Sequence, residues 1–393
     1  MPCQNLLCLP NWQFSNLVHE KNAILFASFD FFLYLCSVFW CSMAILFNIT
    51  HIEEAKRMLE DARRVVILTH MAPDGDAMGS ALGMYHYLCR SLPSVSPQRS
   101  VDVIVPNAFP DFFQWMPGAD KVRVYEKESQ ACSEIVSQAD LFVCTDFNDP
   151  KRIGAVGEKM MENGSPKLLI DHHLNPMDFA SVQFSYPEAS SSCEILYQFL
   201  KATGLQPSEI SLPIATCIYT GLMTDTGNFS YNSTNADLYD IIASLLRVGV
   251  QKDAIYDAVF NQYSTDRVRL TGYALYRKMR IYPEHHIALI TLSADELDMY
   301  HYKPGDCEGL VNMPLQIADV YYSVFMREER PKPGTPKPRI RISFRSQGDR
   351  PVNVWASEVF HGGGHANASG GELFGSLNQA VTLFEKTYKS YIK

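Results

Sequence analysis

Short apolar runs alternate with stretches that carry apolar residues at helical spacing. Four runs rich in β-branched and aliphatic residues predict buried strands: 65–69, 101–105, 141–145 and 168–170. Four periodic stretches predict helices: 77–88, 190–203, 208–223 and 235–248. Because this alternation is typical of a parallel sheet with helices on its faces, the sequence predicts an α/β fold.

A second, smaller α/β unit is predicted after residues 262–285, which carry few signals and which we interpret as a linker. Its strands are expected at 287–292, 320–326 and 339–344, and a closing amphipathic helix at 377–391. The proline-rich segment 331–338 cannot be a central strand and predicts a hairpin loop. We therefore expect an apolar extension at 1–47, a larger domain at 48–261, the linker, and a smaller domain at 286–393.

The apolar extension contains 25 residues, 23–47, of which 21 are apolar. Roughly 20 apolar residues can cross a bilayer. However, Asp30 would then lie in hydrocarbon at a cost of about 2.5–3.5 kcal/mol, and no Lys/Arg asymmetry sets an orientation. We favour a folded chain that begins near Met43, ahead of a helix start at which Thr50 and Glu53 have the spacing of a capping box. The alternatives are an inner-membrane anchor through 23–47 and a buried hairpin.

The net charge and the cysteine content indicate which partners the protein binds and in which cellular compartment it lies. The formal net charge is −9 and the pI is about 5.7, which argues against sequence-blind binding of long nucleic acid. Ten cysteines are scattered without a CxxC pair, which is typical of reduced thiols in the cytoplasm.

Acids and histidines gather where predicted strands and helices end. In an open parallel sheet, ligands bind beyond the carboxyl ends of the strands. Carboxylates mixed with imidazoles favour hard or borderline divalent cations. This number of carboxylates is too large for one ion, and their charges would repel one another unless two ions shared a bridging aspartate. These residues are His70, Asp74, Asp76, Asp146, Asp171, His172, His173 and Asp225.

The C-terminal unit carries a different signal. Residues 327–350 hold eight Lys/Arg against three Asp/Glu, and Arg339, Arg341 and Arg345 share one face of a predicted strand. Three glycines at 362–364, taken to precede a helix, would let backbone N–H groups approach an anion closely. The alternatives are a solvated strand edge and a flexible hairpin.

Together these residues resemble a known family. His70-Met-Ala-Pro-Asp-Gly-Asp-Ala-Met-Gly-Ser80, Asp146, Asp171-His-His173 and Thr224-Asp-Thr-Gly227 are similar to the four motifs of the DHH phosphoesterase superfamily. Arg341-Ile-Ser-Phe-Arg-Ser346 and Gly362-Gly-Gly-His365 resemble its DHH-associated C-terminal domain. The resemblance covers about residues 48–393 and is nearest to the bifunctional nanoRNases (oligoribonucleases) and phosphatases of 3′-phosphoadenosine 5′-phosphate (pAp).

The resemblance implies an active site in a cleft between the two lobes, with two manganese ions for which magnesium or cobalt could substitute. The first ion would be held by His70, Asp74 and Asp146, and the second by Asp76, Asp146, His172 and Asp225. A hydroxide between the ions would attack phosphorus, with His173 beside it, Asp171 orienting the histidine and Asp146 bridging the ions. The resemblance also implies a substrate grip formed by Arg345, Ser346, Gly363, Gly364 and His365.

The leading hypothesis is a manganese-dependent hydrolase that trims short RNA to mononucleotides and removes the 3′-phosphate of pAp. The alternative is a signalling phosphodiesterase acting on a cyclic dinucleotide or its linear product. Short RNA and pAp are thus the expected partners. Long nucleic acid is not expected, a membrane is expected only if 23–47 is an anchor, and a homodimer is possible.

Overall fold

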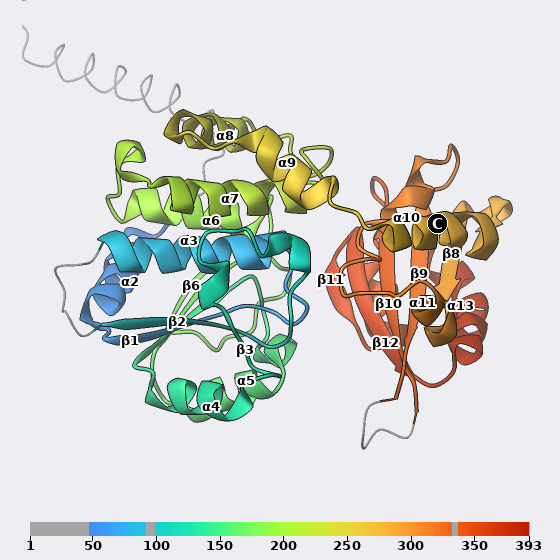
Figure 1. Cartoon of the computed structure of the whole chain (residues 1–393), viewed down its shortest axis with the longest axis horizontal. Coiled ribbons are helices and arrows are strands. Elements are labelled where there is room, and N and C mark those ends of the chain that lie inside the picture. The colour runs from blue at the N-terminus through green and yellow to red at the C-terminus, as the bar shows by residue number, and fades with distance from the viewer. Residues whose placement is uncertain (1–46, 92–98, 332–336, 393) are drawn as a thin grey trace, which may run out of the picture. The chain divides into compact units, whose positions relative to one another are not determined.

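Two six-stranded sheets organise the computed structural model, which describes residues 47–91, 99–331 and 337–392 (Figure 1). In the first sheet the strands run in the order β3-β2-β1-β4-β5-β6, and all pairs are parallel. The strands are β1 (Arg64–Leu68), β2 (Ser100–Val105), β3 (Arg123–Val124), β4 (Leu141–Thr145), β5 (Lys167–Asp171) and β6 (Val182–Ser185). The chain leaves β1 toward β2 on one side and later returns to place β4 on the other side, so the strand order reverses between β1 and β4.

Helices cover both faces of this sheet, as Figure 1 shows for α3, α6 and α7 on one face and α4 and α5 on the other. The helices of this N-terminal lobe are α2 (Ile49–Asp61), α3 (Gly75–Ser91), α4 (Ser129–Gln138), α5 (Ala155–Glu162), α6 (Ser192–Ala202), α7 (Leu212–Asp225), α8 (Ala236–Val248) and α9 (Lys252–Phe260). Alternate residues of β1 point to opposite faces of the sheet and pack into two different hydrophobic cores. Val65 and Ile67 pack on the α3 side, whereas Val66 and Leu68 pack on the α4 side.

Glycines let α3 lie unusually close to α6 and α7. A Cβ atom at Gly79 would lie 2.6 Å from the carbonyl oxygen of Cys217, and one at Gly75 would lie 2.2 Å from the hydroxyl of Thr224. A Cβ atom at Gly221 would lie 2.2 Å from the sulfur of Cys193. This close packing brings the start of α3 next to the end of α7.

The second sheet is mixed and forms the C-terminal lobe. Its order is β11-β12-β10-β9-β8-β7, with β8 and β9 parallel and the other pairs antiparallel. The strands are β7 (Met279–Tyr282), β8 (Ile287–Leu292), β9 (Tyr322–Glu329), β10 (Arg339–Ser346), β11 (Gly363–His365) and β12 (Ala368–Phe374). The helices are α10 (Thr265–Tyr273), α11 (Ala294–Met299), α12 (Asn353–Phe360) and α13 (Leu377–Tyr391).

The predicted fold class is confirmed, and several expectations need correction. The segment 262–285 is not a plain linker, because it contains α10 and β7, and β7 pairs with β8 in the second sheet. The helix expected at 208–223 begins at Leu212, where Pro213 lies in the first turn and fits only a helix start, and it continues to Asp225. The exact domain boundaries stay predictions.

The expected capping box at Thr50 is wrong. Helix α2 begins earlier, and its N-cap is Asn48, whose side-chain oxygen accepts the N–H of Thr50 at 2.9 Å. Except for Phe47, the apolar run 23–47 lies outside the described residues. Within the described ranges, no helix combines the length and the apolar character needed to cross a bilayer.

The close helix packing predicts that Gly79→Ala destabilises the fold by about 1–3 kcal/mol, because its new methyl group must displace backbone of α7. Gly272→Ala is the matched control, since a Cβ atom there has no neighbour within 4 Å and the residue is an exposed part of α10. The control should be neutral or stabilised by up to about 1 kcal/mol. Urea denaturation of both variants measures the difference, and equal stabilities would contradict it.

Candidate active site

The predicted acids and histidines meet at the carboxyl ends of β1, β4 and β5. His70 and Asp74 follow β1 and Asp76 lies in the first turn of α3, while Asp146 directly follows β4. Asp171 ends β5, His172 and His173 follow it, and Asp225 is the last residue of α7. Among the groups that these residues form, His70–Asp74–Asp146 contains the three residues expected around one ion, and Asp76–His172–Asp225 contains three of the four expected around the other. In each group the potential ligand atoms lie within 4.8 Å of one another.

Asp146 faces both groups. Its Oδ2 lies 3.2 Å from Nε2 of His70, and its Oδ1 lies 3.5 Å from Nε2 of His172. The Nε2 atom of His70 is also 3.7 Å from Oδ2 of Asp74. The Nε2 atom of His172 is 3.4 Å from Oδ2 of Asp225 and 3.8 Å from Oδ2 of Asp76. One carboxylate therefore joins two clusters of potential ligand atoms.

Both histidines are oriented by backbone. Nδ1 of His70 lies 3.0 Å from the carbonyl oxygen of Met71, and Nδ1 of His172 lies 3.3 Å from that of Ala189. A carbonyl oxygen only accepts hydrogen bonds, so Nδ1 carries the proton and the Nε2 lone pair points at the carboxylates. Where such a lone pair faces carboxylate oxygens, either a proton on Nε2 or a cation between the two groups removes their repulsion. The donor set therefore fits a divalent cation.

The N-terminus of α6 supports the carboxylates, a feature that sequence reasoning missed. The N–H groups of Ser192 and Cys193 donate to the two oxygens of Asp76 at 2.6 and 2.9 Å. The Ser192 hydroxyl donates to Oδ1 of Asp146 at 2.9 Å. These donors and the positive end of the helix dipole stabilise the negative charges. The signal was the serine run 190–192 at the start of a predicted helix.

Asp146 has a left-handed backbone with a φ of +64°. A non-glycine residue rarely adopts this conformation, which costs of order 1–3 kcal/mol and persists where the surroundings enforce it. Here its N–H donates to the carbonyl oxygen of Ile170 at 3.0 Å, across from β4 to β5. The strained backbone turns the Asp146 side chain toward the site.

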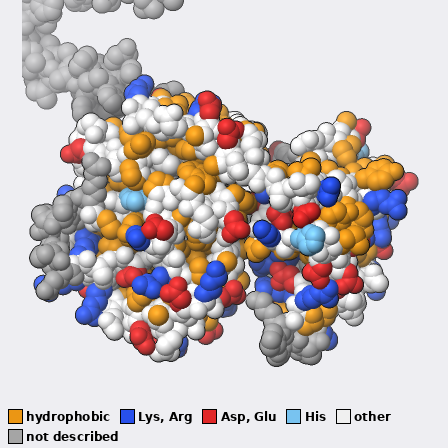
Figure 2. Space-filling view, viewed as in Figure 1, with side chains coloured by type: hydrophobic (Ala, Val, Ile, Leu, Met, Phe, Trp, Pro, Cys, Tyr) orange, Lys and Arg blue, Asp and Glu red, His pale blue; other side chains and the backbone are white. Residues whose placement is uncertain are grey.

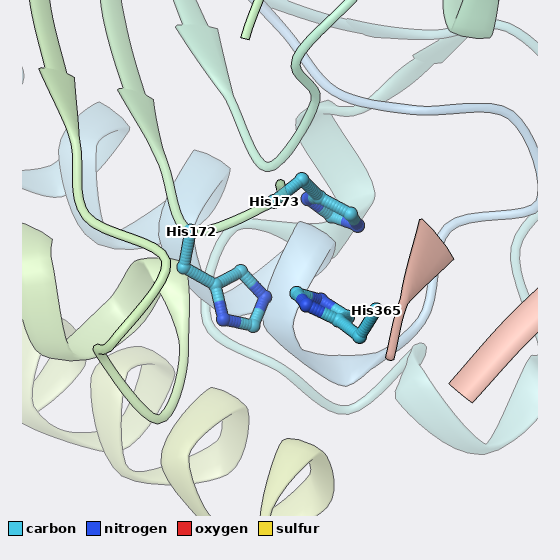
Figure 3. Close-up of side chains that lie close together, drawn as sticks. All are labelled: His172, His173 and His365. Carbon is cyan, nitrogen blue, oxygen red and sulfur yellow. The ribbon is translucent and has the colours of Figure 1, made fainter. Parts of the chain in front are cut away.

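Three imidazoles, those of His172, His173 and His365, converge beside these groups (Figure 3). Nδ1 of His173 is 2.8 Å from Oδ1 of the fully buried Asp171, whose other oxygen accepts the His173 N–H. His365, at the end of β11, stacks on His173 with ring centroids 4.7 Å apart and 23° between the planes. The ring of His365 also lies 4.7 Å from that of His172.

The electrostatics of the site reflect its crowded, buried carboxylates. Burial acts to lower the pKa of His70, but Asp74 and Asp146 raise it to about 10. Burial and neighbouring acids raise the pKa of Asp225 to about 7, against the opposing effect of His172. Without a cation, the cluster is thus stabilised by protons.

The pKa values of His173 and His365 shift in the opposite direction, downward. Burial and the nearby Arg152 lower the pKa of His173 well below its usual value. Burial and His172 lower the pKa of His365 to about 4. Both rings are therefore neutral near pH 7. Arg152, in the 3₁₀ turn after β4, was not singled out from the sequence, although it lies only six residues beyond Asp146.

Of the three arginines expected to form an anion clamp, two have acidic partners. Arg339 pairs with Glu372 on β12, and Arg341 lies 3.7 Å from Glu329 on β9. Arg345 has no ion pair within the described part of the chain. Its guanidinium donates to the carbonyl oxygen of Phe344 at 2.9 Å. Burial lowers the pKa of Arg345, and nearby Tyr231 and Asp225 oppose that change.

The expectation that the three glycines precede a helix is wrong. They follow α12, and Gly363 and Gly364 lie on β11, which pairs with β12. A Cβ atom at Gly362 would lie 1.8 Å from the carbonyl oxygen of Gly370, and Gly364 has a φ of +135°, so both are needed by the hairpin itself. Gly363 is open and exposed. The Ser346 hydroxyl donates within the lobe, to the carbonyl oxygen of Arg350.

Family models match both lobes of the chain. Residues 64–222 match the DHH family, N-terminal domain, and residues 295–393 match the DHHA1 domain. The structure of an exopolyphosphatase-related protein from Bacteroides fragilis is 42% identical, with a TM-score of 0.80, and the match covers 89% of this chain and 98% of that one.

Two curated relatives are more distant. The bifunctional oligoribonuclease and PAP phosphatase NrnA of Thermus thermophilus is 26% identical over 324 residues, which cover 80% of this chain and 86% of that protein. The cyclic-di-AMP phosphodiesterase GdpP of Bacillus subtilis is 22% identical over 356 residues, which cover 86% of this chain and 49% of that protein.

The chain belongs to the DHH family, with a DHHA1 domain in its C-terminal lobe. It is an enzyme, a hydrolase that acts on phosphoester bonds.

The contacts of α6 predict that Ser192→Ala weakens the binding of a divalent cation by about 10- to 100-fold, because Asp146 loses the hydroxyl that orients it. Ser323→Ala is the control, since this buried serine of β9 has a hydroxyl without a partner among the described residues. Calorimetric titration with Mn²⁺ measures both affinities. Equal affinities in the two variants would refute a supporting role for Ser192.

Proposed function

We propose that the chain is a manganese-dependent phosphoesterase that hydrolyses short oligoribonucleotides to mononucleotides and pAp to AMP and phosphate. The observation that carries this proposal is the position of Asp146, whose two oxygens face two separate groups of ligand atoms. Similarity to NrnA over most of the chain supports the choice of substrates. Magnesium or cobalt could take the place of manganese.

His70, Asp74 and Asp146 would hold one ion, and Asp76, Asp146, His172 and Asp225 the other. The four carboxylates carry the charge that two divalent cations neutralise, which supports two ions over one. When bound, such ions lower the pKa of water to make a nucleophile and neutralise charge on the phosphate.

The chain's own groups would position the substrate and its protons. Asp171 accepts the Nδ1 hydrogen of His173, so Nε2 is free to accept a proton or a hydrogen bond near the phosphate. Stacking on His365 fixes the plane of that imidazole. Arg345, which lacks an acidic partner, would bind a second phosphate or the distal nucleotide, with Gly363, Gly364, Ser346 and His365 around it.

Charge supports short substrates. Basic and acidic side chains are interspersed on the face shown in Figure 2, and the net charge of the whole chain is −9. A long strand that left the site would meet mixed charges rather than a continuous basic surface, so too few counterions would be released to favour its binding.

A second candidate is a phosphodiesterase that acts on a cyclic dinucleotide. The similarity to GdpP favours it, although the match covers only 49% of that protein. A matched panel separates the two functions. With Mn²⁺ or Mg²⁺ present, the full chain is given a diribonucleotide, a 24-mer RNA, pAp, cyclic di-AMP and pyrophosphate, and Asp146→Ala controls for contaminating nucleases. Fastest turnover of the diribonucleotide and pAp is expected. Preference for cyclic di-AMP would replace the proposal with the second candidate.

The different contacts of the two adjacent histidines predict different losses. His172→Ala should weaken Mn²⁺ binding strongly, because the Nε2 atom of His172 faces three carboxylates. His173→Ala should keep most Mn²⁺ affinity and lose turnover by about 10²–10⁴-fold, the usual contribution of a positioned acid–base group. Calorimetry and kcat on pAp provide the two readouts. Equal loss of bound Mn²⁺ in both variants would reverse this division of roles.

Arg345→Ala should lower kcat/KM on a diribonucleotide and on pAp by about 1.5–3 kcal/mol in transition-state terms, the range for a hydrogen bond to a charged group. Binding energy from the distal group also raises the rate at the reacting phosphate, so kcat should fall together with affinity. A small chromogenic phosphodiester, too short to reach Arg345, should hardly be affected.

Arg341→Ala is the control on the same face of β10, because its charge is already paired with Glu329. If Arg341→Ala and Arg345→Ala lost equal activity, or if the chromogenic substrate lost as much as pAp, Arg345 would not be the distal grip.

A further inference from the structure

The turn that follows Asp225 has an unusual backbone. Gly227, Asn228 and Phe229 have φ values of +54°, +55° and +62°, so three consecutive residues are left-handed. For a residue other than glycine this conformation costs roughly 1–2 kcal/mol, and for a bulky side chain such as Phe229 it is rare. Strain of this kind persists only where surrounding contacts enforce it, and it concentrates at functional sites.

Thr226 is the main anchor of the turn. Its buried hydroxyl donates to the carbonyl oxygen of Leu222 at 2.6 Å and accepts the N–H of Phe229 at 3.0 Å. Its carbonyl oxygen accepts the N–H groups of Ser230 and Tyr231 at 2.9 and 3.2 Å. The turn is therefore a rigid extension of α7, and it holds the residues that follow it in one place.

Tyr231 is the side chain that this turn presents. Its ring lies against Gly227, where a Cβ atom would approach Cε1 to 2.2 Å, so glycine is required there for the ring to fit. The residue is nevertheless 51% exposed, and its hydroxyl makes no hydrogen bond within the described residues.

Tyr231 also lies close to the catalytic groups. Partial burial and the charge of Asp225 raise the pKa of its hydroxyl, and Arg345 opposes that rise. Tyr231 thus lies near both a predicted metal ligand and the predicted distal grip, and it is neither. A rigid, half-exposed aromatic ring beside a phosphate site has the chemistry that binds a flat, uncharged partner.

We propose that Tyr231 is a base-stacking residue, whose ring binds the nucleobase of the nucleotide held next to Asp225. This inference rests on the proposed function and extends it to the recognition of the base. Every nucleobase has a π face, so stacking binds a base without reading its identity. A nucleotide enzyme that accepts many short sequences needs this kind of contact. Tyr231 contributes to binding specificity for nucleotides over simple phosphate esters.

The experiment combines removal of the ring with removal of the base. Wild type, Tyr231→Ala and Tyr231→Phe are assayed on the diribonucleotide ApA and on two versions of it that lack one adenine, either the 5′ or the 3′ base. Tyr239→Ala is the matched control, because Tyr239 is a 48% exposed tyrosine of the same lobe. Thermal unfolding confirms that each variant is folded.

Tyr231→Ala should lower kcat/KM on ApA by about 10- to 100-fold, the range that stacking on one base supplies. On one of the two abasic substrates it should cause almost no further loss, because the stacked base is already absent. Tyr231→Phe should stay within about threefold of wild type on ApA, since the phenyl ring stacks as the phenol does. Tyr239→Ala should match wild type on all three substrates.

Equal losses for Tyr231→Ala on ApA and on both abasic substrates, or no loss on ApA, would overturn the stacking role. These outcomes differ from failure of the proposed function, in which wild type itself would hydrolyse neither ApA nor pAp. That failure would remove the basis for a nucleobase at Tyr231 as well.

Discussion

The position of Asp146 between two groups of potential ligand atoms is the constraint on which the rest of the site depends. A carboxylate can face both ways only if it projects from a strand between the strands that carry the two histidines. Strand β4 lies between β1 and β5, and its end lies where the strand order reverses. His70 follows β1 on one side, and His172 follows β5 on the other. The left-handed backbone at Asp146 then turns its side chain inward.

The remaining acids reach the same point through helix packing. Asp76 is on α3 and Asp225 ends α7, and only a very short distance between these helices brings both carboxylates to His172. The glycines of α3 and α7 allow that distance. A Cβ atom at Gly221 would lie 2.8 Å from Oδ1 of Asp76 itself. Glycine at such positions therefore serves the chemistry of the site as well as the packing of the core.

Much of the fold was predictable, because a regular spacing of apolar residues indicates which face of a helix or strand is buried. Strands β4 and β8 and helix α13 begin and end at the predicted residues. The elements that the sequence did not predict are short or half-exposed, such as β3, β6 and β11, so their hydrophobic patterns are weak. The residues predicted as metal ligands could be expected to cluster because the carboxyl ends of neighbouring parallel strands meet at one edge of the sheet. The backbone donors of α6 were missed, because N–H groups leave no trace in residue identity and the serine run 190–192 indicated only the start of a helix.

In the C-terminal lobe, residue type alone predicted an anion clamp of three arginines, which is more than the structure supports. Arg339, Arg341 and Arg345 look equivalent on one strand face, but a strand in the middle of a sheet has two neighbours that can supply acids. The register places Glu329 of β9 opposite Arg339, and Glu329 is therefore diagonal to Arg341. It places Glu372 of β12 opposite Arg341, and Glu372 is therefore diagonal to Arg339. Arg345 lies opposite Ser323 and Ala368, which carry no charge. Neighbouring strands thus supply acidic partners to two arginines and none to the third, and only the register distinguishes them. The available charge lies at the end of β10 near Tyr231, which supports a single distal contact rather than a broad basic surface.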